Sequence, residues 1–226
     1  MLTSMTEGLD WANDTEAALL EAALRLAPRL GWTWRLTQAA GADLGLSRAE
    51  VELLVPEGPR DLAALYGRDL DAKALGALAN LDPATLKIRD RIREGALAWL
   101  DAARSHEAAS RRWSGFLALA TNVPLGLRLA WASADCIWRW AGDTATDENH
   151  YTKRALLAGI LISTLAVALS AGRGAAERHL NGRIGAVMAF ERWKGRVAKP
   201  SEMAARVAGL LGRLRYGHGD RSADTI

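Results

Sequence analysis

The chain has 226 residues, of which 50% are hydrophobic and 24% are charged. These proportions are typical of a globular protein with its own core, and they exclude an intrinsically disordered chain. The formal net charge is only +3, so the overall charge gives no reason to expect nucleic-acid binding. Cys136 is the only cysteine, which excludes an intramolecular disulfide and fits a reducing compartment.

The first two dozen residues carry five acids and no Lys or Arg before Arg25. A secretory signal needs a basic start followed by an apolar run, and a mitochondrial presequence needs arginines and few acids. The segment shows neither pattern. From the sequence we therefore expect a protein of the bacterial cytoplasm, peripheral on the inner membrane.

Apolar residues recur at helical spacing along the whole chain, and alternating β-branched runs are absent. The pattern predicts a first helix capped by Asn13 or Asp14 and ended by Pro28 and Gly31. A second, short helix is predicted over residues 34–44. The sequence thus predicts an all-α fold.

A tight turn and a third helix follow. Gly45 to Ser47 form the predicted turn, and Ser47 with Glu50 makes a capping box for a helix that ends before Pro56. Helix, short helix, tight turn and short helix outline a helix-turn-helix. The stretch QAAGADLGLSRAEVELLVPEGPRDLAAL resembles the TetR-type regulators, so we expect a TetR-like helical bundle with a degenerate N-terminal helix-turn-helix.

The charge of this head argues against a DNA reader. Between Thr33 and Arg60 there are three arginines against four acids, and Glu50 and Glu52 stand where regulators carry contact residues. Phosphate neutralisation supplies most of the affinity for DNA, and two carboxylates oppose it. We expect no nucleic-acid partner, with a TetR-type ligand-responsive transcriptional regulator as the alternative.

The remaining chain is divided into a helical body and a tail. Predicted body helices cover residues 60–79, 83–105, 107–119, 124–141, an apolar stretch ending near 171, and 174–195. Residues 155–171 are uncharged, which fits a buried core helix better than a membrane span at this length. The predicted domains are a head (1–60), a helical body (61–198), which is the candidate for the lipid binding discussed below, and a linker with a C-terminal amphipathic helix (199–226).

A charged cluster lies between the two apolar body helices, in AGDTATDENHYTKRALLAG (residues 141–159). A metal site would use Asp143, Asp147, Glu148 and His150. A di-iron site in a helical bundle needs Glu-x-x-His motifs on two helices, and this chain has none. No nucleophile motif or phosphate-binding glycine loop is present either. We expect no catalytic residue, no metal and no cofactor, hence no enzyme.

A plain structural explanation stays open for this cluster. Gly142 would end one helix, and Thr144 or Asp147 would cap the next, whose positive N-terminus favours the acids. Capping does not require the Tyr and Arg that follow, and these two residue types are typical anchors of protein interfaces.

The segment IWRWAGDTATDENHYTKRALLAG resembles the signature of the Coq-nine family of ubiquinone (coenzyme Q) biosynthesis accessory proteins. The shared positions run from Asp135 and Trp138 through the Ala-Gly-Asp turn to Tyr151 and Arg154, and on to Ser163 and Thr164. The likeness extends upstream through KIRDRIREGALAWL and NVPLGLRL. Four positions depart from the family pattern: Glu148, His150, Ile160 and Leu165.

The resemblance implies a TetR-like fold that has lost DNA binding and acts without catalysis. Such proteins bind isoprenoid quinone intermediates or other lipids and dock a di-iron hydroxylase of the ubiquinone pathway. The implied contact surface comprises Asp143, Asp147, Asn149, His150, Tyr151, Lys153 and Arg154. A homodimer is expected as well.

Two further surfaces are expected to contact lipid. The helices around the cluster would line a lipid pocket with Trp131, Ala134, Trp138, Leu157, Ile160, Leu161 and Thr164, although plain core packing is the simpler explanation for any single residue. Asp135, beside this face, is expected to pair with Arg154 or to be exposed. The C-terminal helix carries an apolar stripe with arginines beside it, which fits a membrane surface, the body or a dimer. Its residues are Met203, Arg206, Val207, Leu210, Leu211, Arg213 and Leu214.

Overall fold

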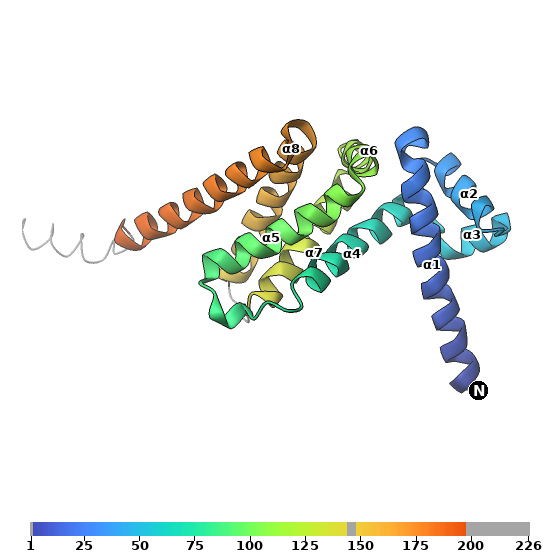
Figure 1. The fold of residues 1–226 in the computed structure, drawn as a ribbon, viewed down its shortest axis with the longest axis horizontal. Helices are drawn as coiled ribbons and strands as arrows, with labels where there is room; N and C mark the ends of the chain where they lie inside the picture. Colours follow the sequence, from blue (N-terminus) through green and yellow to red (C-terminus); the bar gives the residue numbers. More distant parts are fainter. Residues whose placement is uncertain (1, 144–147, 198–226) are drawn as a thin grey trace, which may run out of the picture. The chain divides into compact units, whose positions relative to one another are not determined.

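The computed structural model describes residues 2–143 and 148–197, with the side chains of residues 11–143 and 150–189 (Figure 1). Within these ranges every regular element is a helix, so the all-α prediction is confirmed. The chain divides into two compact units, the first ending at Gly182 and the second starting at Arg183. The predicted boundary near residue 60 falls inside the first unit, at the start of a helix.

The head contains α1 (Leu2–Leu30), α2 (Trp34–Asp43) and α3 (Arg48–Leu54). The predicted start of the first helix was wrong, because α1 runs straight through Asn13 and Asp14. The capping box is confirmed: the Ser47 hydroxyl accepts from the backbone N–H of Glu50, whose carboxylate accepts from the Ser47 backbone. α2 and α3 approach so closely that a Cβ at Gly41 would overlap Val51.

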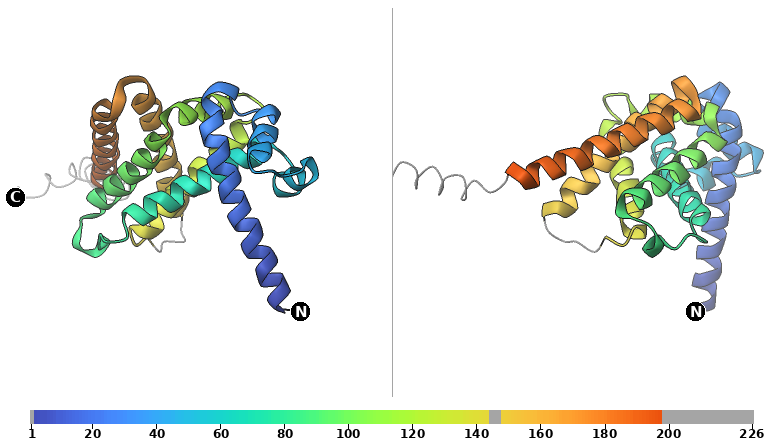
Figure 2. Two further views of the ribbon diagram at one scale, coloured as in Figure 1. Left: turned by 45° about the vertical axis from the view of Figure 1, so that its right-hand side comes forward. Right: turned by 60° about the vertical axis from the view of Figure 1, so that its left-hand side comes forward.

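The body is built from α4 (Pro59–Ala77), the 3-10 turn η1 (Pro83–Thr85), α5 (Ile88–Ser105), α6 (Glu107–Leu117) and α7 (Val123–Trp140). α4, α5 and α7 pack against one another (Figure 2). The helix predicted from residue 83 starts only at Ile88, because the Asp82 carboxylate caps the isolated turn at Ala84 instead. At Gly95 a Cβ would lie 2.6 Å from the Ile137 side chain, so this glycine lets α5 reach α7.

An aromatic cluster joins the head to the body. Tyr66 of α4 is fully buried, stacks on Trp32 at 5.7 Å between ring centroids, and meets Trp113 edge-on at 5.4 Å. Its hydroxyl lies 2.6 Å from the Ser110 hydroxyl, and the Trp32 indole N–H donates to the Ala109 carbonyl. Burial raises the pKa of Tyr66 to about 12. Every polar atom of these rings is therefore matched inside the core.

α8 (Glu148–Val197) is interrupted at Gly172, whose φ of 80° breaks the helix in two, as the sequence predicted. Beyond the break, the Arg173 guanidinium donates to both carboxylate oxygens of Asp101 on α5, at 2.8 and 2.9 Å. One helix, within His150–Ala189, is long and apolar enough to cross a membrane by length and composition, and less than half of its most apolar stretch is buried.

Candidate functional site at the α7–α8 junction

α7 ends in a tightly bonded turn. Gly142 takes a φ of 86°, a left-handed conformation that glycine adopts without strain, and the Asp143 N–H donates back to the Trp138 carbonyl at 3.0 Å. Arg91 of α5 donates to the Ala141 carbonyl at 2.7 Å. The turn is therefore fixed from both sides before α8 begins.

Arg154 on the first turns of α8 is the central residue of the junction. Its side chain is 2% exposed, and its Nε donates to Asp135 of α7 at 2.5 Å while Nη1 donates to Asp143 at 3.1 Å. Nη1 also donates to the His150 carbonyl. A buried guanidinium is tolerated only when carboxylates compensate it, and here two of them do. The predicted pairing of Asp135 with Arg154 is confirmed.

Asp143 and Lys153 extend this network. The Lys153 ammonium donates to Asp143 at 2.9 Å and lies 5.4 Å from the centre of the Trp138 ring, whose indole N–H donates to the Lys153 carbonyl. Burial acts to raise the pKa of the Asp143 carboxyl, but the hydrogen bonds from Lys153 and Arg154 outweigh it and lower the pKa. Asp143 is thus a charged structural group.

Tyr151 points the other way. Its side chain is 64% exposed, in contrast to the buried Arg154 three residues later. Its ring lies 6.1 Å from Trp131 of α7 and 5.2 Å from the His150 ring. The two aromatic neighbours restrict the ring while leaving one side open to solvent. A restricted, exposed tyrosine has the properties of an interface anchor.

The predicted contact surface is thereby divided by the structure. Arg154 and Asp143 lie in the interior, so they act by holding the turn rather than by touching a partner. Lys153 is partly exposed, and Tyr151 is the most exposed of these side chains among those described. The side chains of Asp147 and Asn149 lie outside the described residues. Sequence reasoning treated all these positions alike because charge-rich helix ends are usually solvated.

The predicted lipid-lining residues lie on the buried or half-buried faces of α7 and α8. Ala134, Leu157, Ile160, Leu161 and Thr164 are at most 5% exposed, while Trp131 and Trp138 are half-buried. Core packing accounts for the aliphatic members. Thr164 differs, because its hydroxyl is buried and has no hydrogen-bond partner among the described residues. An unsatisfied buried hydroxyl is costly and needs an explanation.

No pattern in the sequence pointed to Asp71, a part-buried carboxylate on α4. It accepts a hydrogen bond from the Trp99 indole N–H at 3.1 Å, and burial raises its pKa to about 6. Within the described part of the chain, no group of three or more His, Cys, Asp or Glu is placed to hold a metal ion. The predicted membrane-binding residues, Met203 to Leu214, lie outside the described residues.

These features define an all-helical protein with a helix-turn-helix-like head and an α7–α8 junction that is held by buried ion pairs. The model of the COQ9 family matches residues 123–191, which cover α7, the junction and most of α8. The predicted resemblance to the Coq-nine family is confirmed by this match and by the curated relatives of the chain.

The ubiquinone biosynthesis protein COQ9, mitochondrial, of Xenopus tropicalis is 29% identical over 224 residues, which cover 92% of this chain and 68% of that protein. Its Bos taurus counterpart is 30% identical over 204 residues, covering 86% and 63%. The Homo sapiens protein is 28% identical over 204 residues, with the same coverage. All three are named as mitochondrial proteins of eukaryotes. The expectation of a bacterial cytoplasmic location is therefore wrong, and these relatives point to mitochondria.

Proposed function

We propose that this chain acts in ubiquinone biosynthesis as a non-enzymatic accessory protein. It binds an isoprenoid quinone intermediate or another lipid and presents it, at a membrane surface, to a partner hydroxylase. The names of the relatives support the pathway. The match to the family model spans the α7–α8 junction, which supports that junction as the working part of the molecule. The alternative of a transcriptional regulator has no support among the relatives.

The observation that carries the proposal is the division of the junction into an inner and an outer side. The inner side, formed by Asp135, Asp143 and Arg154, satisfies its own charges. The outer side presents Tyr151 beside Trp131. A motif needed only for folding does not require an exposed tyrosine held beside the half-buried Trp131, whereas exposed aromatic anchors are typical of docking surfaces.

Thr164 supports the lipid-binding part of the proposal. Its unpartnered hydroxyl lies among buried apolar side chains of α8, between Leu161 and Leu165 along the chain. A polar group of a bound lipid would satisfy it, and the surrounding aliphatic side chains suit an isoprenoid chain. Lipid extracted from the purified protein and identified by mass spectrometry tests this part. Recovery of no stoichiometric lipid from protein purified without detergent would count against it.

The exposed face of α8 supports a homodimer. Between Ala155 and Gly172 the chain carries no charged side chain, yet a continuous side of the helix is open to solvent. Its exposed members are Ala155, Leu156, Gly159, Ile162, Ala166 and Ser170. An uncharged face of this length with small residues suits close packing against a second copy.

Docking of the hydroxylase is tested with Tyr151→Ala. We expect co-purification with the pathway's hydroxylase to fall by at least tenfold, because truncating an aromatic anchor typically costs about 2 kcal/mol or more of binding. The melting temperature should stay unchanged, since the side chain is exposed. Leu53→Ala on α3, another exposed large apolar side chain, is the matched control and should bind normally. Normal hydroxylase binding by Tyr151→Ala would refute docking at this surface.

A further inference from the structure

Charge is strongly segregated along this chain. Residues 22–42 and 108–134 contain no Asp or Glu, although acids and bases are nearly balanced over the whole sequence. Both stretches carry only basic charge, from Arg25, Arg29, Arg35, Arg111, Arg112 and Arg128. All six arginines are exposed. These two stretches therefore bring far more positive charge to the surface than the net charge of the chain suggests.

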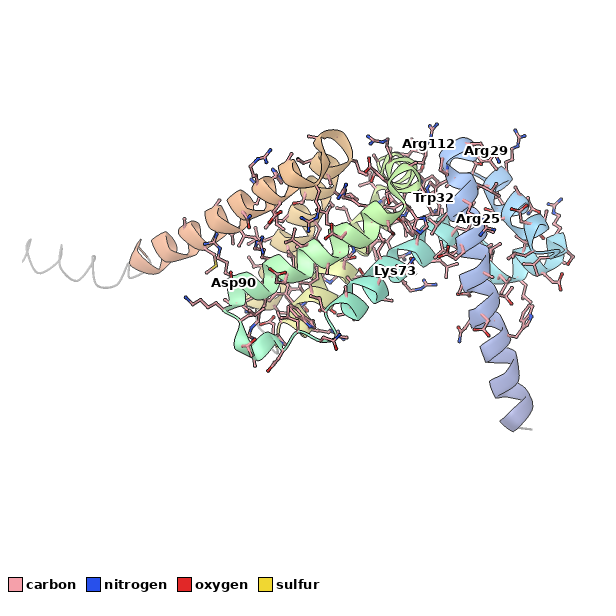
Figure 3. The ribbon with its side chains drawn as sticks, viewed as in Figure 1. Arg25, Arg29, Trp32, Lys73, Asp90 and Arg112 are labelled. Carbon is pink, nitrogen blue, oxygen red and sulfur yellow. The ribbon has the colours of Figure 1, made fainter. Side chains whose placement is uncertain are left out.

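The fold places the two stretches against each other. The Arg112 guanidinium on α6 donates to the Pro28 carbonyl near the end of α1, and the Trp32 indole N–H donates to the Ala109 carbonyl. Arg25 and Arg29 are one helical turn apart on α1 (Figure 3). Arg111 is paired with Glu107 at 3.1 Å, which neutralises one of the arginines. The surface formed by Arg25, Arg29 and Arg112 is called the basic corner below.

An apolar edge adjoins the basic corner. Leu119, Val123 and Leu127 recur every four residues from the end of α6 into α7, with 55%, 40% and 58% of each side chain exposed. Between α1 and α6 lies a hollow of about 410 Å³, lined by Gly31, Trp32, Arg111, Arg112, Gly115, Phe116 and Leu119. Apolar side chains that project beside exposed guanidinium groups match the interface of a bilayer, where apolar groups insert and arginines meet phosphate.

We propose that the basic corner and its apolar edge form a membrane-contact surface selective for anionic phospholipid. Leu119, Val123 and Leu127 enter the headgroup layer, and Arg25, Arg29 and Arg112 contact lipid phosphates. This inference rests on the proposed membrane function and deepens it by adding a second contact, on helices of the head and the body, to the one predicted for residues 203–214. Exposed leucines distinguish this surface from one built for nucleic acid, where bases would require stacking or polar groups beside the arginines.

The test uses the full chain and vesicles of phosphatidylcholine, alone or mixed with phosphatidylglycerol. The double variant Arg29→Glu with Arg112→Glu should lower partitioning onto the mixed vesicles by at least tenfold, because each arginine near anionic lipid contributes about a factor of five in partitioning. The matched control is Arg60→Glu with Arg68→Glu on α4, which changes the net charge equally and should partition normally. Equal losses in both variants would show only an effect of net charge and would overturn the proposal.

A second variant keeps the proposal testable if the first one misfolds. Leu119→Asp with Leu127→Asp changes only exposed side chains, and it should lower partitioning while leaving the melting temperature unchanged. Unaltered partitioning of this variant would overturn insertion of the apolar edge. Inorganic phosphate at concentrations that match the lipid phosphate should not displace the protein. Displacement by it, or tighter binding of duplex DNA than of mixed vesicles, would assign the surface to another ligand and overturn the proposal.

The result of the vesicle test can be distinguished from the result of the hydroxylase-docking test of the proposed function. Hydroxylase docking is measured in solution with Tyr151→Ala and does not depend on vesicles. Leu210→Glu with Leu214→Glu removes the apolar stripe of the C-terminal segment from the full chain. In this background the basic corner should still retain the chain on mixed vesicles, and reversing Arg29 and Arg112 should remove the remaining binding. Complete loss of binding before that reversal would refute an independent contact.

Discussion

The α3 helix of the head and the α7–α8 junction are both rich in charge, but they handle it in opposite ways. On α3, Arg48 pairs with Glu52 one turn away, and the two side chains are 81% and 47% exposed. At the junction, Arg154 pairs with Asp135 nineteen residues earlier and with Asp143, and its side chain is 2% exposed. The first arrangement is local and solvated, and the second is long-range and buried.

The difference in burial between these two sets of ion pairs shows where charge determines how helices pack. Water screens an exposed pair, so α3 would keep its shape without it. The buried guanidinium has no water to replace a lost carboxylate, so α7 and α8 must stay in the one arrangement that supplies both partners.

The largest expected effect is at Arg154. Arg154→Ala should lower the free energy of unfolding by about 3 kcal/mol, because Asp135 and Asp143 lose their buried partner and keep only the more exposed Arg139 and Lys153. Chemical denaturation with a helix-sensitive signal measures this. The Asp135→Asn and Asp143→Asn variants should each cost less, since the guanidinium keeps one carboxylate. A loss below about 1 kcal/mol for Arg154→Ala would mean that water reaches the junction, and the contrast with α3 would disappear.

Two carboxylates of the body sharpen the contrast further. Asp143 has cationic partners and a lowered pKa, whereas Asp71 forms no ion pair with any described residue and has a pKa raised by burial to about 6. A raised carboxyl pKa means that the folded state binds the proton more tightly than the unfolded state. Stability from this group is therefore greatest at low pH and falls as pH rises from about 4 to 6.

Asp71→Asn should remove that pH dependence. A difference of about two pKa units corresponds to about 3 kcal/mol, so the variant should gain up to that amount at pH 7 and little at pH 4. The measurement is the free energy of unfolding of both proteins across this range. The amide keeps an acceptor for the Trp99 indole. Parallel curves for the two proteins would show that Asp71 is solvated in the folded state.

Much of the fold followed from local signals in the sequence. The capping box at Ser47, the turn at Gly142 and the break at Gly172 each depend on a few neighbouring residues, and each appears where the sequence placed it. The predicted start of α1 was wrong because a residue that can cap a helix, such as Asp14, can also lie inside one. Asp82 caused the reverse error, by capping a short 3-10 turn before α5.

The site was only partly predictable for a different reason. The pairing of Arg154 with Asp135 was one of two outcomes that the sequence allowed, and only the packing of α8 on α7 decides between a buried and an exposed guanidinium. Asp71 carried no local signal, because its hydrogen-bond partners Trp99 and Ser133 lie on two other helices. The basic corner likewise depends on two stretches that meet only in the folded chain.

The smallest expected effects lie in α3, and they complete the comparison. Ser47→Ala should cost about 1 kcal/mol of unfolding free energy, because the first turn of the helix loses its side-chain cap. Arg48→Ala should leave the free energy of unfolding unchanged within error, since its partner Glu52 is solvated on its own. The two substitutions sit on adjacent residues, so denaturation of both under one set of conditions separates backbone capping from surface charge. If Arg48→Ala proved as costly as Ser47→Ala, exposed charge would stabilise the head, and solvation would not be what distinguishes the head from the junction.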